Sequence, residues 1–395
     1  MEETTVRFLE RTLMGPGPSN IDPRVYAAMT RPIMGHLDPE FIKVMDEIMV
    51  LLRKVFQTKN RLTFPVSATG SGGMEAALAN VIEPGDRVVI LINGVFGERM
   101  ADIARRYGAE VEVLEIEWGK VFNPEEVKSF LSKHAPVKVV GIVHAETSTG
   151  ALQPLEEISR VVHDYNSLFL VDTVTSLGGT EVLLDKWGID IAYSGTQKCL
   201  SCPPGLAPIS FSERAVETMK QRKTPVVSWY FDVNMLRRYW ETGERFYHHT
   251  APITMNYALW EALRIIEEEG LEARFERHSK LSAILQDALE ALGLELLVEK
   301  PYRAPMITSV IIPDGVSDSD IRGKLLTQYS IEIGGGLRDL KGRIWRIGLM
   351  GYSCQKKNIS LLIGALGQCL NECGYKADIK AAFSVLDEEG INVRL

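Results

Sequence analysis

Apolar residues in the first half of the chain form short continuous runs that alternate with longer stretches of helical spacing. The stretches with helical spacing include 97–107, 124–133 and 154–165. The short runs are mostly rich in Val, Ile and Leu, and they cover 62–66, 87–92, 110–116, 137–143, 168–171 and 189–193. Short buried strands separated by helices predict an α/β fold, in which a mainly parallel sheet carries helices on both faces.

Two charged residues lie just beyond these apolar runs. Asp172 directly follows the run 168–171, and Lys198 closes the segment 193–198 after the run 189–193. Ligands of such sheets bind beyond the carboxyl ends of the strands, where both residues are expected. Pyridoxal 5'-phosphate (PLP) enzymes need a lysine that forms a Schiff base with the cofactor and an aspartate that keeps the ring nitrogen protonated. The pair therefore indicates a PLP site, although a lysine after a strand is more often a solvated loop cation.

A loop of small residues, 67–73, separates the first run from a good helix-forming stretch, 74–78. Small residues let backbone N–H groups approach an anion, and the helix N-terminus adds partial positive charge, so the loop is a candidate phosphate site. A flexible turn is the simpler alternative. A dinucleotide site is disfavoured. Its fingerprint needs an acidic residue at the end of the next strand, whereas here that strand is followed by Asn93 and Gly94.

Three further positions are candidates for ligand contact. Phe96 is placed at the ligand edge of the sheet, where its ring would lie on a flat heterocycle or simply pack at a helix start. The polar loop 144–150 follows the buried run 139–143, and it would bond a cofactor or only cap the strand. Arg346 stands in the apolar run 344–348, where a buried guanidinium needs a substrate carboxylate or an internal acidic partner.

Length, composition and charge limit the classes of function. A chain of 395 residues exceeds one usual core, so we expect a large domain and a smaller one. The net charge of -8 argues against nucleic acid as a partner. The charged N-terminus, the lack of a membrane-length apolar run and the five cysteines favour a cytoplasmic protein. Cys199 and Cys202 form a CxxC without a second ligand pair, so no metal site is expected.

Several motifs in a fixed order resemble the class V aminotransferases of PLP fold type I, in particular their alanine-glyoxylate and serine-glyoxylate branch. The similarity runs from Gly15 to about Leu370, through the segments 15–20, 35–41, 146–150, 171–179, 194–198, 247–250 and 346–351. It implies an N-terminal arm (1–15), a large PLP-binding domain with a mainly parallel, seven-stranded type of sheet (16–268) and a smaller α+β C-terminal domain (269–395). The tail from about 371 has no clear counterpart, and an extra helix is expected there.

The resemblance also implies a role for each matching residue. Lys198 matches the Schiff-base lysine, and Asp172 matches the partner of the pyridine nitrogen. Phosphate-binding positions are matched by Thr69, Gly70, Ser71 and Gln197, with Tyr247 and Thr250 reaching the phosphate from a neighbouring subunit. Phe96 and Val174 match the residues on the two ring faces, Thr147 the one near the ring hydroxyl, and Arg346 the arginine that binds the substrate carboxylate. Relatives often carry histidine at Ser71 and tryptophan at Phe96.

The resulting expectation is a homodimeric PLP-dependent aminotransferase that passes the amino group of alanine or serine to glyoxylate by a ping-pong mechanism. A ureidoglycine-glyoxylate aminotransferase is the nearest alternative, although Tyr247 looks more like the alanine branch. A cysteine desulfurase would need a reactive cysteine on a mobile loop, and 334–342 contains none. Lys198 argues against a non-catalytic PLP-fold binding protein. The choice between alanine and serine stays open, because both present the same carboxylate and amine.

Overall fold

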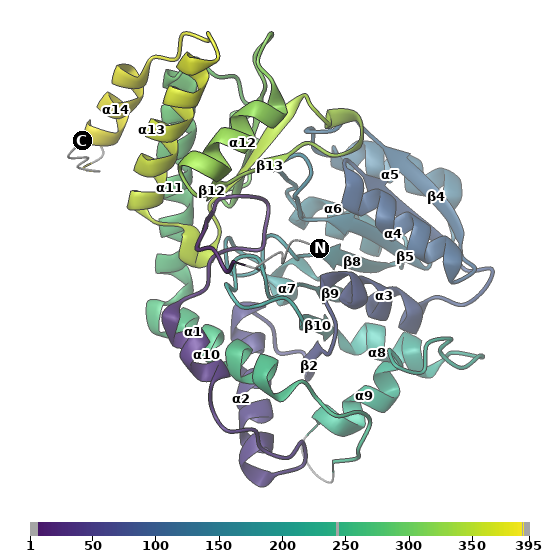
Figure 1. Ribbon diagram of the computed structural model, residues 1–395. Helices are drawn as coiled ribbons and strands as arrows, with labels where there is room; N and C mark the ends of the chain where they lie inside the picture. The colour runs from purple at the N-terminus through teal and green to yellow at the C-terminus, as the bar shows by residue number, and fades with distance from the viewer. Residues whose placement is uncertain (1–6, 242–244, 389, 391–395) are drawn as a thin grey trace, which may run out of the picture.

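A seven-stranded sheet forms the centre of the computed structural model, which describes residues 7–241, 245–388 and 390 (Figure 1). Its strands lie in the order β2-β10-β9-β8-β5-β3-β4, and all pairs are parallel except those of β10 with β2 and β9. The strands are β2 (Leu62–Val66), β3 (Arg87–Ile92), β4 (Glu110–Glu115), β5 (Val139–Val143), β8 (Leu168–Asp172), β9 (Ile191–Tyr193) and β10 (Ala207–Phe211). The predicted mainly parallel α/β sheet is confirmed, and β10 is the strand that the pattern did not predict.

Helices cover both faces of this sheet. Alternate residues of β3 belong to different core clusters, with Val88 and Ile90 on one face and Val89 and Leu91 on the other. One cluster includes α3 (Gly70–Val81), α4 (Val95–Arg106), α8 (Glu213–Lys220) and α9 (Val233–Trp240). The other includes α5 (Pro124–His134), α6 (Glu156–Asp164), α7 (Leu184–Trp187) and α10 (Ile253–Glu269). Both receive residues from α1 (Pro23–Met29) and α2 (Pro39–Val55).

A smaller α+β unit follows α10 and has a core cluster of its own. Its antiparallel sheet, in the order β11-β14-β13, consists of β11 (Ile307–Ile311), β13 (Gly334–Gly335) and β14 (Ile344–Gly348). Its helices are α11 (Leu271–Ala291), α12 (Asp318–Gln328), α13 (Lys356–Glu372) and α14 (Ile379–Glu388), and α14 packs on α11 and α13 (Figure 1). The extra C-terminal helix is therefore present. The domain limits stay a prediction; the one at 268/269 falls at the junction of α10 and α11, and residues 1–6, 389 and 391–395 lie outside the described part.

Short elements tie the two units together. β1 (Thr12–Leu13) pairs in parallel with β12 (Ile331–Glu332), so the N-terminal arm lies against the smaller unit. The remaining elements are the hairpin β6 (Ala145–Glu146) and β7 (Ala151–Leu152) and the 3-10 turns η1 (Lys300–Tyr302), η2 (Arg338–Leu340) and η3 (Gly351–Ser353). Among the described residues, no helix is both long and apolar enough to cross a membrane.

Candidate active site

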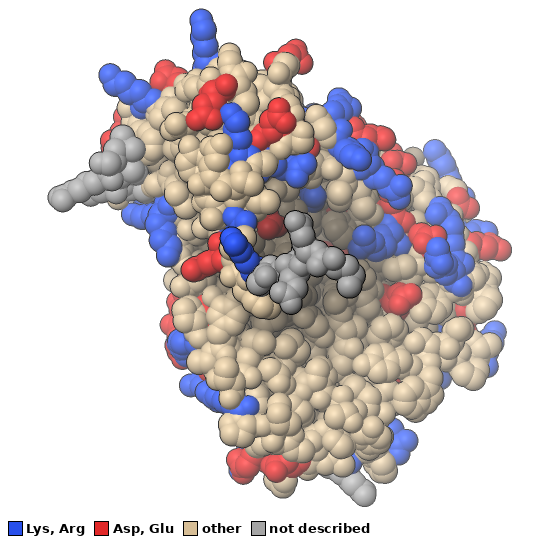
Figure 2. Space-filling view, in the orientation of Figure 1, with Lys and Arg blue, Asp and Glu red and all other residues tan. Residues whose placement is uncertain are grey.

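A cavity of about 230 Å³ lies at the carboxyl ends of the central strands, and the face seen in Figure 2 is hollowed between the two units. Eight of the predicted site residues line this cavity: Gly70, Ser71, Phe96, Thr147, Asp172, Val174, Gln197 and Lys198. They lie at the end of β8, in the first turns of α3 and α4, and in the segments that follow β6, β8 and β9. The carboxyl ends of parallel strands share one edge of the sheet, which is why Gly70 and Lys198, 128 positions apart in sequence, meet here.

Asp172 ends β8 as a buried carboxylate with two hydrogen-bond donors. The hydroxyl of Tyr193 donates to Oδ2 at 2.7 Å, and the backbone N–H of Val174 donates to Oδ1 at 2.8 Å. Burial raises the pKa of Asp172 from 3.8 to about 6, although these two bonds and the charge of Lys198 favour the ionised form. A cation placed beside Asp172 in the cavity would relieve this desolvation.

Lys198 follows β9 and is also buried, at 8% exposure. Burial, together with the smaller effect of the positive charge of Arg346, lowers the pKa of its ammonium group to about 8. Its Nζ contacts the carbonyl oxygen of Pro16 in the N-terminal arm. A Cβ on Gly17 would lie 2.5 Å from Cδ of Lys198, so this close approach requires glycine at position 17.

Apolar side chains of Phe96 and Val174 contribute to the cavity wall. Phe96 is held by Glu146, a fully buried carboxylate that accepts a hydrogen bond from the Phe96 backbone N–H at 3.2 Å. Glu146 also accepts from the N–H of Ser148 at 3.0 Å and from its hydroxyl at 2.6 Å. Burial raises the pKa of Glu146, and these donors oppose the rise. The loop after β5 therefore fixes the start of α4 and the place of the Phe96 ring.

The first turn of α3 forms another part of the cavity wall. Gly70 and Ser71 begin this helix, whose first N–H groups have no acceptor within the helix and carry partial positive charge. Ser71 Oγ accepts a hydrogen bond from Arg99 Nη1 at 3.1 Å. Gln197 Oε1 is buried without a hydrogen-bond partner among the described residues. Such a polar atom beside a helix N-terminus fits a polar ligand group at this end of the cavity.

Arg346 in β14 is buried, yet no carboxylate pairs with it within the described chain. Its Nε donates to the Gly335 carbonyl at 2.8 Å, and its Nη1 donates to the Thr147 carbonyl at 3.1 Å. Burial lowers its pKa to about 10, while the charge of Glu146 opposes this change. The internal ion pair considered from the sequence is thus not seen here. An anionic ligand near Thr147 would supply the missing charge.

Four predicted site residues do not line the cavity of a single chain: Thr69, Tyr247, Thr250 and Arg346, which reaches the wall only through its hydrogen bond to the Thr147 carbonyl. Thr69 is the exposed N-cap residue of α3 and makes no side-chain cap bond. Tyr247 is 60% exposed, and its hydroxyl lies 3.4 Å from that of Thr250. Their predicted contact with a neighbouring subunit stays a prediction.

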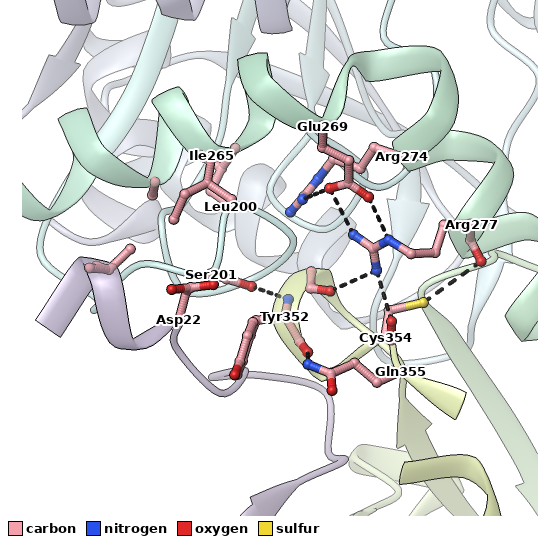
Figure 3. Close-up of a pocket in the computed structure, with 13 residues that line it drawn as sticks. Asp22, Leu200, Ser201, Ile265, Glu269, Arg274, Arg277, Tyr352, Cys354 and Gln355 are labelled. Carbon is pink, nitrogen blue, oxygen red and sulfur yellow. Dashed lines mark hydrogen bonds and ion pairs between the residues drawn. The ribbon is translucent and has the colours of Figure 1, made fainter. Parts of the chain in front are cut away.

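A second cavity, of about 350 Å³, is lined in part by Leu200 and Ser201, which follow Lys198 in the chain (Figure 3). Glu269 lies there between two guanidinium groups, with Arg274 Nη1 at 2.6 Å and Arg277 Nε at 2.5 Å. Burial favours a higher pKa for Glu269, but the two arginines lower it overall. Arg274 also donates to the Cys199 carbonyl at 2.5 Å, and Arg277 to that of Cys354 at 2.8 Å. Through these bonds, the smaller unit holds the loop that carries Lys198 in place.

Sequence reasoning did not identify several residues that hold the site. Tyr193 and Glu146 appeared only as parts of motifs. The role of the Glu269 cluster was missed because Arg274 and Arg277 also bond the carbonyls of Cys199 and Cys354, which lie 75 and 77 positions away. Arg99 could have been suspected from its place one turn after Phe96 on an amphipathic helix. The assembled cavity joins apolar walls, a buried carboxylate, a buried amine and a positively charged end at α3 and Arg99, and Arg346 is hydrogen-bonded to its lining residue Thr147. This arrangement suits a planar heterocyclic ligand with an anionic substituent, together with a small carboxylate.

Comparisons with known proteins agree with this description. The family model of Aminotransferase class-V matches residues 22–357. The (S)-ureidoglycine–glyoxylate transaminase of Bacillus subtilis is 44% identical over 402 residues, which cover 96% of each chain. The alanine–glyoxylate aminotransferase of Callithrix jacchus is 42% identical over 93% of this chain and 89% of its own. The crystal structure of the alanine–glyoxylate aminotransferase from Nostoc sp. is 50% identical, with a TM-score of 0.91 over 94% of this chain and 98% of its own.

Fold and site together define a two-unit α/β enzyme with a buried lysine–aspartate pair at the sheet edge. The chain belongs to the class V aminotransferase family, and the predicted enzyme class, a transaminase, is confirmed by these relatives. The predicted fold type is confirmed as well, since the neighbours that share it include a pyridoxamine–pyruvate aminotransferase with a TM-score of 0.90.

Asp172→Asn should stabilise the ligand-free protein at alkaline pH. Burial raises the pKa of Asp172 from 3.8 to about 6, so its contribution to stability falls as the pH rises from about 4 to about 6. At pH 8 the folded protein holds an unfavourable carboxylate, and removing it should raise the free energy of unfolding by about 3 kcal/mol. At pH 4.5 the carboxyl is largely protonated in the fold, and the gain should shrink to about 1 kcal/mol.

Urea unfolding at the two pH values measures this difference. Asp190→Asn is the matched control, because Asp190 is also buried but pairs with Arg214 at 3.0 Å and accepts the Phe169 N–H at 2.9 Å. The control should lose stability at both pH values. Equal destabilisation of both variants at pH 8 would contradict the unfavourable burial of Asp172.

Proposed function

We propose that this protein is a PLP-dependent aminotransferase that transfers an amino group from alanine or serine to glyoxylate. One observation carries the proposal: buried Lys198 and buried Asp172 line the same cavity as Thr147. The carbonyl of Thr147 accepts a hydrogen bond from Arg346, an arginine that forms no ion pair with a carboxylate among the described residues. The alanine–glyoxylate aminotransferases among the relatives support the choice of substrates.

The cavity residues fit PLP, and each has a defined contact to make. Phe96 and Val174 would lie on the two faces of the ring, and Thr147 would lie near the ring hydroxyl. Asp172 would face the ring nitrogen. Gly70 and Ser71, with Gln197, would hold the phosphate through first-turn N–H groups and side-chain donors. When bound, PLP supplies an electron sink for the bonds that break at the substrate α-carbon.

Asp172 would keep the ring nitrogen protonated. Each unit of pKa difference between the partners corresponds to about 1.4 kcal/mol of preference for the charged pair. The donated hydrogen bonds from Tyr193 and from the Val174 N–H orient both carboxylate oxygens. The residue therefore presents a fixed, ionised carboxylate as soon as a cation lies beside it.

Lys198 would hold the cofactor and move the proton at the substrate α-carbon. The efficiency of a general acid–base group is greatest when its pKa lies near the working pH. Burial, with help from Arg346, brings the pKa of Lys198 to about 8. At neutral to slightly alkaline pH this amine both accepts and returns a proton, which the two half-reactions of a transaminase require.

Arg346 would bind the one carboxylate that amino donor and glyoxylate have in common. Its guanidinium is held by the carbonyls of Gly335 and Thr147, so the remaining N–H groups are presented in a fixed plane. Because both substrates use the same place in turn, ping-pong kinetics follow.

Two alternatives from the same fold differ in substrate. The Bacillus subtilis relative supports (S)-ureidoglycine as a donor, and its structure has a TM-score of 0.94; Tyr247 instead favours the alanine branch.

A cysteine desulfurase is disfavoured because no cysteine is among the described residues that line the cavity. A non-catalytic binding protein would not need Lys198. The cytoplasmic location stays a prediction.

The surface beside the phosphate loop supports a homodimer. Trp229 is 58% and Tyr247 60% exposed, and Val227 and Phe246 are exposed apolar neighbours in sequence. This segment contacts the loop directly, since the Tyr230 hydroxyl donates to the Ser67 carbonyl at 3.0 Å. The face over α2 and α9 carries few charged side chains (Figures 1 and 2). An exposed aromatic surface of this kind favours covering by a second copy, which would bring its Tyr247 and Thr250 to the site.

A donor and acceptor panel tests the proposed reaction. Alanine and serine should each support transamination of glyoxylate, and pyruvate should be a poorer acceptor. Glycine formation and loss of the donor, followed by chromatography, measure this. Lys198→Ala should lose at least about a hundredfold in turnover, since general acid–base groups contribute on that scale or more. Turnover with (S)-ureidoglycine alone would favour the alternative, and absence of any transamination would refute the proposal.

Arg346→Lys should impair both half-reactions. Lysine keeps the charge but loses the planar fork, and loss of a buried charge-assisted contact costs about 2 to 5 kcal/mol. Stopped-flow spectroscopy of each half-reaction should therefore show a large loss with the donor and with glyoxylate. Arg343→Lys, three residues earlier and exposed, is the matched control and should change neither. A defect with only one substrate would show that Arg346 is not the common carboxylate site.

Mixed dimers test the shared site. Lys198→Ala subunits and Tyr247→Phe/Thr250→Ala subunits should each form defective homodimers. If the site uses residues of both subunits, each mixed dimer contains one wholly wild-type site, so random mixing should restore about a quarter of wild-type activity. Refolding the two variants together, compared with refolding each alone, measures the gain. An active monomer in sedimentation would disprove the shared site.

A further inference from the structure

Helix α4 places an arginine, Arg99, among the residues that line the cavity; its side chain is exposed, and the proposed reaction does not use it. Its Nη1 donates to Ser71 Oγ at 3.1 Å, and its guanidinium carbon lies 4.9 Å from the centre of the Phe96 ring. None of the described carboxylates forms an ion pair with Arg99, whereas on the same helix Arg106 pairs with Asp102 at 2.8 Å. The charge of Arg99 is therefore available to a ligand.

Arg99 and Arg346 contact different residues of the cavity wall. Arg99, which lines the cavity, is bound to the hydroxyl of Ser71 in the first turn of α3, and Arg346, which does not line it, is bound to the carbonyl of Thr147. The helix N-terminus adds partial positive charge beside Arg99. A guanidinium, a hydroxyl and first-turn N–H groups therefore converge at the α3 end of the cavity.

We infer that Arg99 is a direct ligand of the cofactor phosphate. The inference deepens the proposed PLP chemistry and rests on it. A guanidinium presents paired donors in a plane, which suits phosphate oxygens. The hydrogen bond to Ser71 orients the guanidinium, and the guanidinium packs over the face of the Phe96 ring. Arg99 therefore contacts both Ser71, which would hold the phosphate, and Phe96, which would pack on the ring.

The charge of Arg99 also reaches the buried end of the site. Burial raises the pKa of Tyr193, and the field of Arg99 opposes that rise. Tyr193 donates to Asp172, so the guanidinium lies within electrostatic range of the group that faces the ring nitrogen.

Binding of PLP and of pyridoxal to the cofactor-free protein tests the assignment, since pyridoxal lacks only the phosphate. Arg99→Met should weaken PLP binding on the order of tenfold to a hundredfold, the usual range for one charge-assisted contact, and leave pyridoxal binding unchanged. Arg99→Lys should lie between. Arg105→Met, an exposed arginine on the same helix, is the matched control. Absorbance and tryptophan fluorescence titrations give the dissociation constants without any activity measurement.

Each outcome decides the matter. A selective loss of PLP affinity in Arg99→Met, with unchanged circular dichroism, supports the phosphate contact. Equal weakening of PLP and pyridoxal would show that Arg99 acts only by supporting Phe96, and unchanged affinity for both would show a surface cation; either result overturns the inference. A wild-type protein that binds neither compound would refute the proposed cofactor, which is a separate failure from a loss confined to the variant.

Discussion

Desolvation of charged groups at the carboxyl edge of the sheet is the constraint on which the site depends. Asp172 and Lys198 line one cavity, and Arg346 is hydrogen-bonded to Thr147 in its wall. Burial shifts the pKa of each of the three groups in the direction that favours its neutral form. Charges in such a place are unfavourable unless a ligand of opposite charge is supplied. In the proposed function, a cationic ring nitrogen and an anionic substrate would supply these opposite charges.

Maintaining this arrangement requires rigid support from groups that touch no substrate. Glu146 fixes the backbone at Phe96, and Tyr193 fixes Asp172. Glu269, between Arg274 and Arg277, joins the Lys198 loop to the smaller unit. Most of these contacts end on backbone atoms, so they position whole loops rather than single side chains. The catalytic geometry is consequently a property of both units together.

The relatives share one acceptor in their names and differ in the amino donor. In the proposed function, one arginine would bind the substrate carboxylate and the cofactor would meet the reacting group. Every small amino acid and glyoxylate have these two parts, so neither contact distinguishes one donor from another. Discrimination among donors then falls to side chains that surround the variable group. Tyr247 and its neighbours, which lie outside the cavity of one chain, are placed to contribute only if a second copy approaches.

The sequence by itself determined the sheet, its helices and the cavity residues carried by strand ends. Continuous Val, Ile and Leu runs predict buried strands because only a sheet covered on both faces hides them, and Asp172 and Lys198 follow from the rule that parallel strands present their carboxyl ends together. Tertiary structure alone decided the roles of Arg99, Tyr193, Glu146 and the Glu269 cluster. Each also has a partner that is distant in the chain: Arg99 bonds Ser71, 28 positions away, Tyr193 bonds Asp172, 21 away, and Glu146 bonds Phe96, 50 away. A buried polar group has no local sequence pattern, so its role comes from the acceptor or charge that folding brings within about 3 Å.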